Sequence, residues 1–348
     1  MRVLTTMLGA AVLAAGLSMP ATPATAQEPQ IQEWQVPYEN SRPRDPYVAP
    51  DGRVWFVGQR THYVAAFDPQ TEEFTKFDLE DGTGPHNLIV DADGTIWYAG
   101  NRARHIGKVN PVTGNIEKIM MPDERARDPH TLVFDGKGNI WFTMQGANMI
   151  GKLVMATGEV SLVEAPTIDG GQRGSSSRPY GIKVDSEGRP WAVLVGTNLI
   201  ATVDPASMEL STYELPADGA RPRRLEIASN DQIYYVDFSR GYLGHFDPVT
   251  KQVEEWQNPG GAESRPYGMA IDRDDRVWFV ETGVSPNTFV GFDTATEQFL
   301  SVTPIASGAG SVRHMYYDEG TNSIWFGTDN NTLGQAKLPP KQQAVGSR

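Results

Sequence analysis

Short runs of β-favouring residues alternate with turn residues along most of the chain. In one copy, Val133 and Phe134 precede a polar turn, Asp135-Gly136-Lys137-Gly138-Asn139, and Ile140, Trp141 and Phe142 follow it. Branched and aromatic residues favour strands, whereas Gly beside Asp or Asn favours tight turns. The pattern predicts a β-hairpin of two short strands.

The same hairpin pattern recurs along the chain, each time with an aromatic residue at the start of its second strand. The seven aromatic residues are Trp55, Trp97, Trp141, Trp191, Tyr234, Trp278 and Trp325. A repeat of about 40 to 50 residues that carries only strand signals is typical of a β-propeller. The sequence therefore predicts an all-β fold: seven blades, each a four-stranded antiparallel sheet.

The two ends of the repeat region complement each other. Residues 31–36 have the pattern of an outer strand without the three that should precede it, whereas the last copy, at 312–338, lacks a fourth strand. We expect the N-terminal strand to complete the last blade and close the ring. The propeller then occupies residues 27–338, and residues 339–348 form a disordered tail.

Residues 1–26 have the features of a cleaved signal peptide. Arg2 is followed by an apolar run at 7–17 and by the small-residue sequence Ala24-Thr25-Ala26, and the run is too short to span a bilayer. The sequence predicts export to a periplasm or the medium. Without cysteine, no disulfides form.

The acidic composition bears on possible partners. The net charge of −13 disfavours binding to nucleic acid or to anionic membranes. No second apolar span follows the first. We expect a monomer whose ligand is a small molecule or a cyclic peptide.

One position of the repeat carries candidate chemistry. Eleven residues before each aromatic residue stands Arg, His or Tyr, and in six copies Pro precedes it. In a propeller the innermost strands run along the axis, so we expect these side chains to surround one mouth of the central channel. The position is occupied by Arg44, His86, His130, Tyr180, Arg223, Tyr267 and His314.

The ends of the second strands return to the same mouth. Asp237 and Glu281 stand there in adjacent blades, where they are candidates to bind a cation or to pair with Arg223. The pattern leaves two interpretations open: a ligand site, or a set of polar side chains that bond to one another and plug a wet channel.

The repeated Asp-x-x-Gly-x-Ile-Trp-Phe sequence and the strands at 106–109 and 150–153 resemble those of the virginiamycin B lyase family. Members are seven-bladed propellers that linearise streptogramin B antibiotics by elimination, and thereby confer antibiotic resistance. The family pattern has an acid two residues before a His, then a Trp-Phe pair and a Glu, with the acid and the Glu holding magnesium. Asp128 and His130 match the first part, but Gln145 replaces the Glu, and the pattern lies in the third blade rather than the last.

The resemblance implies a catalytic centre at His130, with Asp128 and Gln145 at the magnesium position and with His86 and Tyr180 in the adjoining blades. Elimination needs a base of near-neutral pKa, a role that suits His. Because Gln145 lacks the negative charge that Mg²⁺ prefers, we expect weaker magnesium binding.

Two alternatives remain at the level of sequence. One is a non-catalytic exported propeller that binds a small molecule or a partner protein at the channel mouth. The other is a gluconolactonase-like calcium enzyme, for which Asn87, Asp237 and Glu281 make a poor ligand set.

Overall fold

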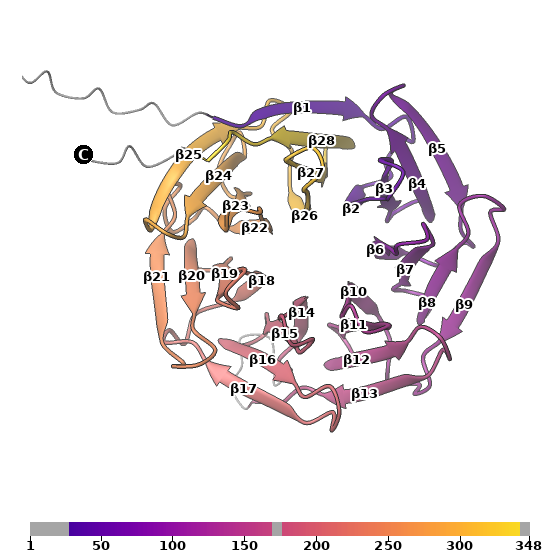
Figure 1. Ribbon diagram of the computed structural model, residues 1–348, viewed down its shortest axis with the longest axis horizontal. Coiled ribbons are helices and arrows are strands. Elements are labelled where there is room, and N and C mark those ends of the chain that lie inside the picture. The colour runs from indigo at the N-terminus through magenta and orange to yellow at the C-terminus, as the bar shows by residue number, and fades with distance from the viewer. Residues whose placement is uncertain (1–27, 169–175, 342–348) are drawn as a thin grey trace, which may run out of the picture.

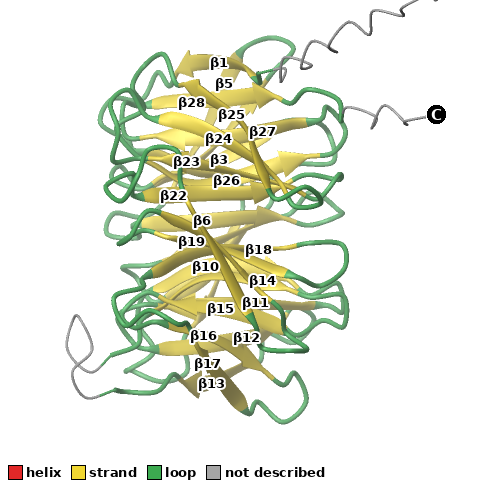
Figure 2. Cartoon of the chain, turned by 90° about the vertical axis from the view of Figure 1, so that its left-hand side faces the viewer, coloured by secondary structure: helices red, strands yellow, loops and turns green. Residues whose placement is uncertain are grey.

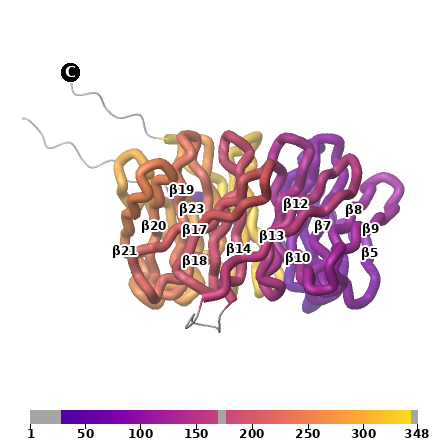
Figure 3. Tube along the Cα trace, turned by 90° about the horizontal axis from the view of Figure 1, so that it is seen from below, coloured from indigo at the N-terminus to yellow at the C-terminus, as the bar shows by residue number. Residues whose placement is uncertain are grey.

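Seven four-stranded antiparallel sheets surround a central axis in the computed structural model, which describes residues 28–168 and 176–341. Figure 1 shows the ring along its axis, and Figures 2 and 3 show it edge-on as a disc with loops on both faces. The predicted seven-bladed propeller is confirmed. The predicted signal peptide at 1–26 and most of the predicted tail lie outside the described residues.

Each of the first six blades takes four consecutive strands, numbered outward from the axis. Blades 1 to 3 comprise β2 (Pro43–Val48), β3 (Val54–Gly58), β4 (Tyr63–Asp68) and β5 (Glu73–Asp78); β6 (Pro85–Val90), β7 (Ile96–Gly100), β8 (His105–Val109) and β9 (Ile116–Met120); and β10 (Pro129–Phe134), β11 (Asn139–Met144), β12 (Met149–Val154) and β13 (Val160–Glu164).

Blades 4 to 6 repeat this order. They comprise β14 (Pro179–Val184), β15 (Pro190–Leu194), β16 (Leu199–Val203) and β17 (Leu210–Glu214); β18 (Pro222–Ile227), β19 (Ile233–Asp237), β20 (Tyr242–Phe246) and β21 (Val253–Gln257); and β22 (Pro266–Ile271), β23 (Arg276–Glu281), β24 (Thr288–Asp293) and β25 (Gln298–Pro304).

The seventh blade joins the two ends of the chain. Its strands are β26 (Val312–Asp318), β27 (Ser323–Thr328) and β28 (Thr332–Lys337), and β1 (Gln30–Gln35) pairs with β28 as the outermost strand. Ile31 lies opposite Ala336 in that pairing. The predicted closure of the ring by the N-terminal strand is confirmed.

The repeated Asp of the hairpin turn links the turn to the blade core. Asp272 accepts hydrogen bonds from backbone N–H groups within its turn, and its other oxygen accepts one of 2.9 Å from the buried indole of Trp278. Asp91 and Asp185 accept the indole N–H in the same way in two other blades. In these three blades the bond accounts for the fixed spacing of Asp and Trp, since it satisfies polar groups that the blade buries, whereas the indole N–H of Trp141 has no partner among the described residues.

The hydrophobic core lies between neighbouring blades. Trp97 of blade 2, for example, belongs to the same buried cluster as Leu132 and Phe142 of blade 3. Each blade therefore buries its faces against two others, and the ring positions the innermost strands around the axis.

A β-bulge interrupts the pairing of every innermost strand with the next one. In β10, His130 and Thr131 together lie between the paired residues Pro129 and Leu132, opposite Thr143 alone. A bulge of this kind redirects side chains and is frequent beside functional sites. It allows two successive residues of each innermost strand, rather than one, to reach the channel.

Candidate functional site

Two histidines and a tyrosine from three adjacent blades stack at one mouth of the channel. The ring centroids of His86 and His130 are 3.6 Å apart, and those of His130 and Tyr180 are 4.2 Å apart. All three side chains are buried. The sequence prediction thus named three side chains that the structure brings into contact.

Tyr180 continues the row to the sixth blade. Its hydroxyl forms a short hydrogen bond with that of Tyr267. The Arg223 guanidinium lies 4.0 Å from the Tyr267 ring centroid and 4.1 Å from that of Phe238. Arg44 completes this side of the mouth, where it bonds to Asp45 and to Gln59.

The seventh blade differs from the prediction by one residue. Tyr316 pairs with Trp325, whereas Val133 pairs with Trp141 in the third blade. The turn of the seventh hairpin is thus one residue longer, and Arg313, not His314, takes the mouth position. Arg313 lies 5.7 Å from the Tyr267 ring centroid and forms an ion pair of 2.6 Å with Asp329.

A second layer of polar residues, one position further along each innermost strand, lies below the mouth. Arg224 crosses the channel there: it donates to the Arg313 carbonyl (3.0 Å) and to the Thr131 hydroxyl (3.1 Å). Its guanidinium also lies 3.8 Å from Asp45. The layer consists of Asp45, Asn87, Thr131, Gly181, Arg224, Gly268 and His314.

The two glycines of this layer make room for the others. A Cβ at Gly181 would lie 3.0 Å from the backbone of Arg224, and one at Gly268 would lie 2.8 Å from Val312. Asn87 connects blades by donating to Asp45 (3.0 Å) and accepting from the Leu132 N–H (2.8 Å). The second layer therefore fits the predicted polar plug, directly beneath the mouth.

Hydrogen bonds favour different tautomers for the two stacked histidines. Nδ1 of His86 lies 3.1 Å from the His130 carbonyl oxygen, which only accepts, so Nδ1 carries the proton and Nε2 keeps a lone pair. Nδ1 of His130 lies 2.8 Å from the Thr131 hydroxyl, which already accepts from Arg224. We assign the Thr131 proton to the bond with His130 Nδ1, and this assignment gives His130 an N–H at Nε2.

Burial and the arginines set the charge states at the mouth. Burial, together with Arg44 for His86 and with Arg224 for His130, holds the pKa of both imidazoles well below its ordinary value, so both are neutral at pH 7. Burial opposes ionisation of Tyr267, yet Arg223, Arg44 and other guanidinium groups lower its pKa to about 7. Burial and the Tyr267 oxygen raise the pKa of Tyr180, which therefore stays protonated and donates to Tyr267.

The residues at the predicted magnesium position do not fit that ion. The Asp128 carboxylate accepts the backbone N–H groups of Gly146 (2.5 Å) and Ala147 (3.0 Å), so it fixes the loop after β11. Gln145 adds only a neutral amide. Within residues 28–168 and 176–341, no group of three or more His, Cys, Asp or Glu side chains is placed to hold a metal. Magnesium prefers several hard anionic oxygens, which this set does not offer.

The expectation that Asp237 and Glu281 reach the mouth is wrong. Asp237 accepts from the backbone of Arg221 and pairs with Arg240 (2.6 Å), not with Arg223. Glu281 accepts from the Gly260 N–H (2.7 Å) and the Thr288 hydroxyl (2.6 Å). Both carboxylates are buried, and their hydrogen-bond partners lie in the adjoining loops and strands.

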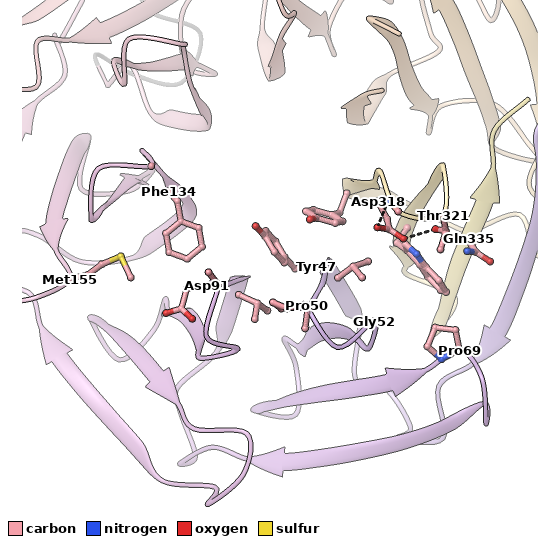
Figure 4. Close-up of a pocket in the computed structure, with 18 of the residues that line it drawn as sticks. Tyr47, Pro50, Gly52, Pro69, Asp91, Phe134, Met155, Asp318, Thr321 and Gln335 are labelled. Atoms are coloured by element: carbon pink, nitrogen blue, oxygen red, sulfur yellow. Dashed lines mark hydrogen bonds between the residues drawn. The ribbon is translucent and has the colours of Figure 1, made fainter. Parts of the chain in front are cut away.

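A separate groove of about 920 Å³ opens at the other end of the channel. Figure 4 shows Tyr47, Pro50, Phe134 and Met155 among the residues that line it. Val48 and Phe134 end the innermost strands that begin at Pro43 and Pro129. Strands of six residues place this groove roughly 17 Å from the mouth, and it contains none of the predicted site residues.

Comparison with known proteins gives a consistent picture. The model of the virginiamycin B lyase family matches residues 21–285. No curated protein matches the chain. Many solved structures share its fold, and three of them are matched over all or nearly all of their own length.

The first of these structures is selenomethionine-substituted virginiamycin B lyase from Staphylococcus aureus, with 21% identity, a TM-score of 0.78, and coverage of 90% of this chain and 100% of that one. A catalytically inactive form of the S. aureus enzyme with quinupristin matches at 20% identity, a TM-score of 0.79 and the same coverage. The WD40 propeller domain of Doa1 matches at 13% identity, a TM-score of 0.70, and coverage of 88% and 96%.

Proposed function

Because the chain belongs to the virginiamycin B lyase family, we propose that it is a carbon–oxygen lyase that acts on an ester-linked peptide of the streptogramin B type. The observation that carries the proposal is the pair of stacked, neutral imidazoles with complementary tautomers: a lone pair at His86 Nε2 beside an N–H at His130 Nε2. A base next to a hydrogen-bond donor is what elimination beside a carbonyl group requires.

The step itself needs no redox partner. His86 removes the proton from the carbon α to a carbonyl, and that electron pair forms the Cα–Cβ double bond. The Cβ–O bond breaks, and the ester oxygen leaves as a carboxylate. The His130 N–H and the nearby guanidinium groups stabilise the negative charge that develops on the carbonyl oxygen, and Tyr180 bounds the site. No step is assigned to magnesium, because the donor set does not fit it.

A non-catalytic binding propeller is the second candidate. The observation that favours it is the second layer, in which Asp45, Asn87, Thr131 and Arg224 bond to one another across the channel. Such a network stabilises a rigid floor for a bound ligand and does not by itself require turnover. Under this interpretation the same mouth binds a small molecule or a partner protein without changing it.

The proposal includes export, which the signal peptide pattern at 1–26 supports. The part of the chain that the structure describes contains no helix long and apolar enough to cross a membrane. Sequencing the N-terminus of the protein recovered from the periplasm or medium checks this, and we expect it to begin at Gln27.

The function is tested by incubating the purified protein with quinupristin and following the product by mass spectrometry. Elimination leaves the mass unchanged and gives a linear product, whereas hydrolysis adds the mass of one water. We expect a linear isomer, and no loss of activity in EDTA.

Variants assign the roles. His86→Gln should lower kcat by about 10²- to 10⁴-fold, the usual contribution of a general base, and His130→Gln should lower it as well. His245→Gln is the matched control, because His245 lies in β20 and bonds to Gln232, away from the channel. If His245→Gln and His86→Gln lose activity equally, or if quinupristin stays intact, the binding interpretation replaces the lyase.

A further inference from the structure

Positive charge collects at the mouth of a chain whose net charge is −13. Five guanidinium groups meet there, and their ion pairs involve two carboxylates, Asp45 and Asp329. The five belong to Arg42, Arg44, Arg223, Arg224 and Arg313. This local excess of positive charge is the opposite of what a divalent metal site needs and suits an anion.

Several of these guanidinium groups are not fully hydrogen-bonded. Arg44 is 4% exposed, and its second terminal nitrogen, Nη2, has no hydrogen-bond partner among the described residues. Nε of Arg223 is likewise buried without a partner in that part of the chain. Because unpaired buried donors are costly, native proteins satisfy them with a protein group, an ordered water, or a bound ion or ligand. Arg313 completes the arrangement on the opposite side of Tyr267.

We propose that the mouth is a binding site for a carboxylate ligand, held by the guanidinium groups of Arg44, Arg223 and Arg313 against the Tyr180–Tyr267 pair. A guanidinium group presents paired N–H donors that match the two oxygens of a carboxylate. Several such groups around one mouth confine a planar anion in both position and orientation.

In the absence of ligand, Tyr267 acts as the counter-ion of these arginines. Arg223, Arg44, Arg224 and Arg313 lower its pKa to about 7, and Tyr180 donates a hydrogen bond to its oxygen. A carboxylate that enters the mouth neutralises part of the same positive charge. The pKa of Tyr267 then rises, so binding near pH 8 draws a proton onto the phenolate.

The proposal names a substrate class for the lyase, and in this respect it rests on the proposed function. Removal of a proton α to a carboxylate generates a dianion, which needs more electrostatic stabilisation than the singly charged enolate of a neutral ester or amide. Fixed guanidinium groups stabilise that charge in the place where a metal ion would otherwise act. The structure thus favours a β-acyloxy carboxylic acid over its neutral amide.

Binding is tested with two unreactive probes, N-acetylthreonine and its N-methylamide, by titration calorimetry of the full chain at pH 8. We expect the carboxylate to bind, the amide to bind at least about tenfold more weakly, and bound carboxylate to reduce the tyrosinate absorbance. Arg223→Gln and Arg313→Gln should each weaken carboxylate binding by roughly 10- to 100-fold, the range of a charge-assisted hydrogen bond.

Two controls accompany these variants. Arg53→Gln removes the same charge from the opposite face, where Arg53 pairs with Asp51, and should leave binding unchanged. Arg223→Lys keeps the charge but loses the paired donors, and should retain only part of the affinity. Equal binding of the two probes, or full affinity in Arg223→Gln, overturns the proposal.

A turnover assay with two substrates distinguishes failure of the anion site from failure of the proposed lyase activity. The substrates are N-acetyl-O-benzoylthreonine and its N-methylamide, which share one leaving group. Faster elimination of the carboxylate than of the amide supports both proposals. Elimination of the carboxylate alone upholds the anion site and refutes a cyclic peptide as the substrate. Carboxylate binding without elimination of either substrate upholds the anion site and refutes the lyase. Elimination of the amide at an equal or higher rate upholds the lyase and refutes the anion site.

Discussion

At the scale of single residues, the chemical properties of the mouth depend on which of its side chains carry a proton. His86 and His130 are both neutral imidazoles, yet the His130 carbonyl on one side and the Thr131 hydroxyl on the other give them opposite tautomers. Tyr180 and Tyr267 likewise share one type of side chain but differ in charge, because Arg223 lies closer to the ring of Tyr267 (4.0 Å) than to that of Tyr180 (5.4 Å), and the Tyr267 oxygen raises the pKa of Tyr180. Identical side chains therefore have different chemical roles.

The ionisation of Tyr267 gives a spectroscopic prediction. In an ultraviolet titration of the folded protein, one tyrosine should ionise near pH 7, well below the ordinary value of about 10. The groups that face it are Tyr180 and the guanidinium groups of Arg223, Arg44, Arg224 and Arg313. Tyr267→Phe should abolish this transition, whereas Tyr213→Phe, in the outer strand β17, should keep it. A wild-type titration confined to the range around pH 10 would contradict the assignment.

The two neutral histidines give a prediction for acid stability. Their folded-state pKa values lie well below that of an unfolded histidine, so the unfolded chain binds more protons below about pH 6.5. Each histidine therefore makes the free energy of unfolding fall by about 1.4 kcal/mol per pH unit on acidification through this range.

Urea unfolding at pH 7 and pH 5 measures this slope. His130→Gln should reduce the pH dependence of the free energy of unfolding by the contribution of one histidine, provided that the variant unfolds cooperatively. A slope equal to that of the wild type would show that His130 titrates normally in the folded state.

At the scale of elements, the repeat determined what was predictable from sequence. The mouth position was found because Pro and an aromatic residue mark it at fixed offsets. The second layer was missed because alternation predicts that successive residues of a strand point to opposite sides, and the bulge in each innermost strand breaks that rule. A signal was nevertheless present: Asp45, Asn87, Thr131 and Arg224 are polar residues that directly follow the mouth position within otherwise buried strands.

The same reasoning explains the error at His314. Counting back from Trp325 assumes that all hairpin turns have one length, and the turn between β26 and β27 has an extra residue. Asp237 and Glu281 were misplaced for another reason. Sequence places a residue at the end of a strand, but the hydrogen bonds that turn its side chain toward a loop come from residues distant in the chain, such as Gly260 for Glu281.

The closing strand carries a prediction of its own. Trp34 of β1 stacks on Trp325, with ring centroids 5.6 Å apart, and its indole donates to Glu72 (2.9 Å) in the first blade. Trp34→Ala should lower the free energy of unfolding by about 1–3 kcal/mol. It should also allow a protease to cut near residues 28–36 before the rest of the protein is digested.

Trp256→Ala is the matched control for this variant. Trp256 lies in β21, the outermost strand of a blade built from consecutive segments, and packs on Phe292. Its loss should destabilise the protein without exposing the N-terminal strand. If both variants release the N-terminal segment equally, β1 is not the weak point of the ring.

At the scale of the whole molecule, the channel has two unlike ends. The mouth is cationic and rich in ionisable groups, whereas the groove at the far end has a volume of about 920 Å³ and is lined by residues such as Tyr47, Pro50, Phe134 and Met155. The second layer lies between them, with Arg224 across the axis. Arg224 and its partners therefore lie between a substrate at the mouth and a molecule in the groove, and the candidate chemistry and the groove belong to different faces.

The pairing of β1 with β28 has a consequence for the timing of folding. β1 is the first strand to leave the ribosome, but it cannot pair until β28 is synthesised about 300 residues later. Contacts so distant in sequence form slowly. Until then the growing chain is an open arc whose end blades lack a neighbour, with an unpaired strand edge that favours association between chains. The chain therefore becomes resistant to proteases and to self-association only when β1 pairs with β28. Any delay in this pairing prolongs the time that the chain remains an open arc.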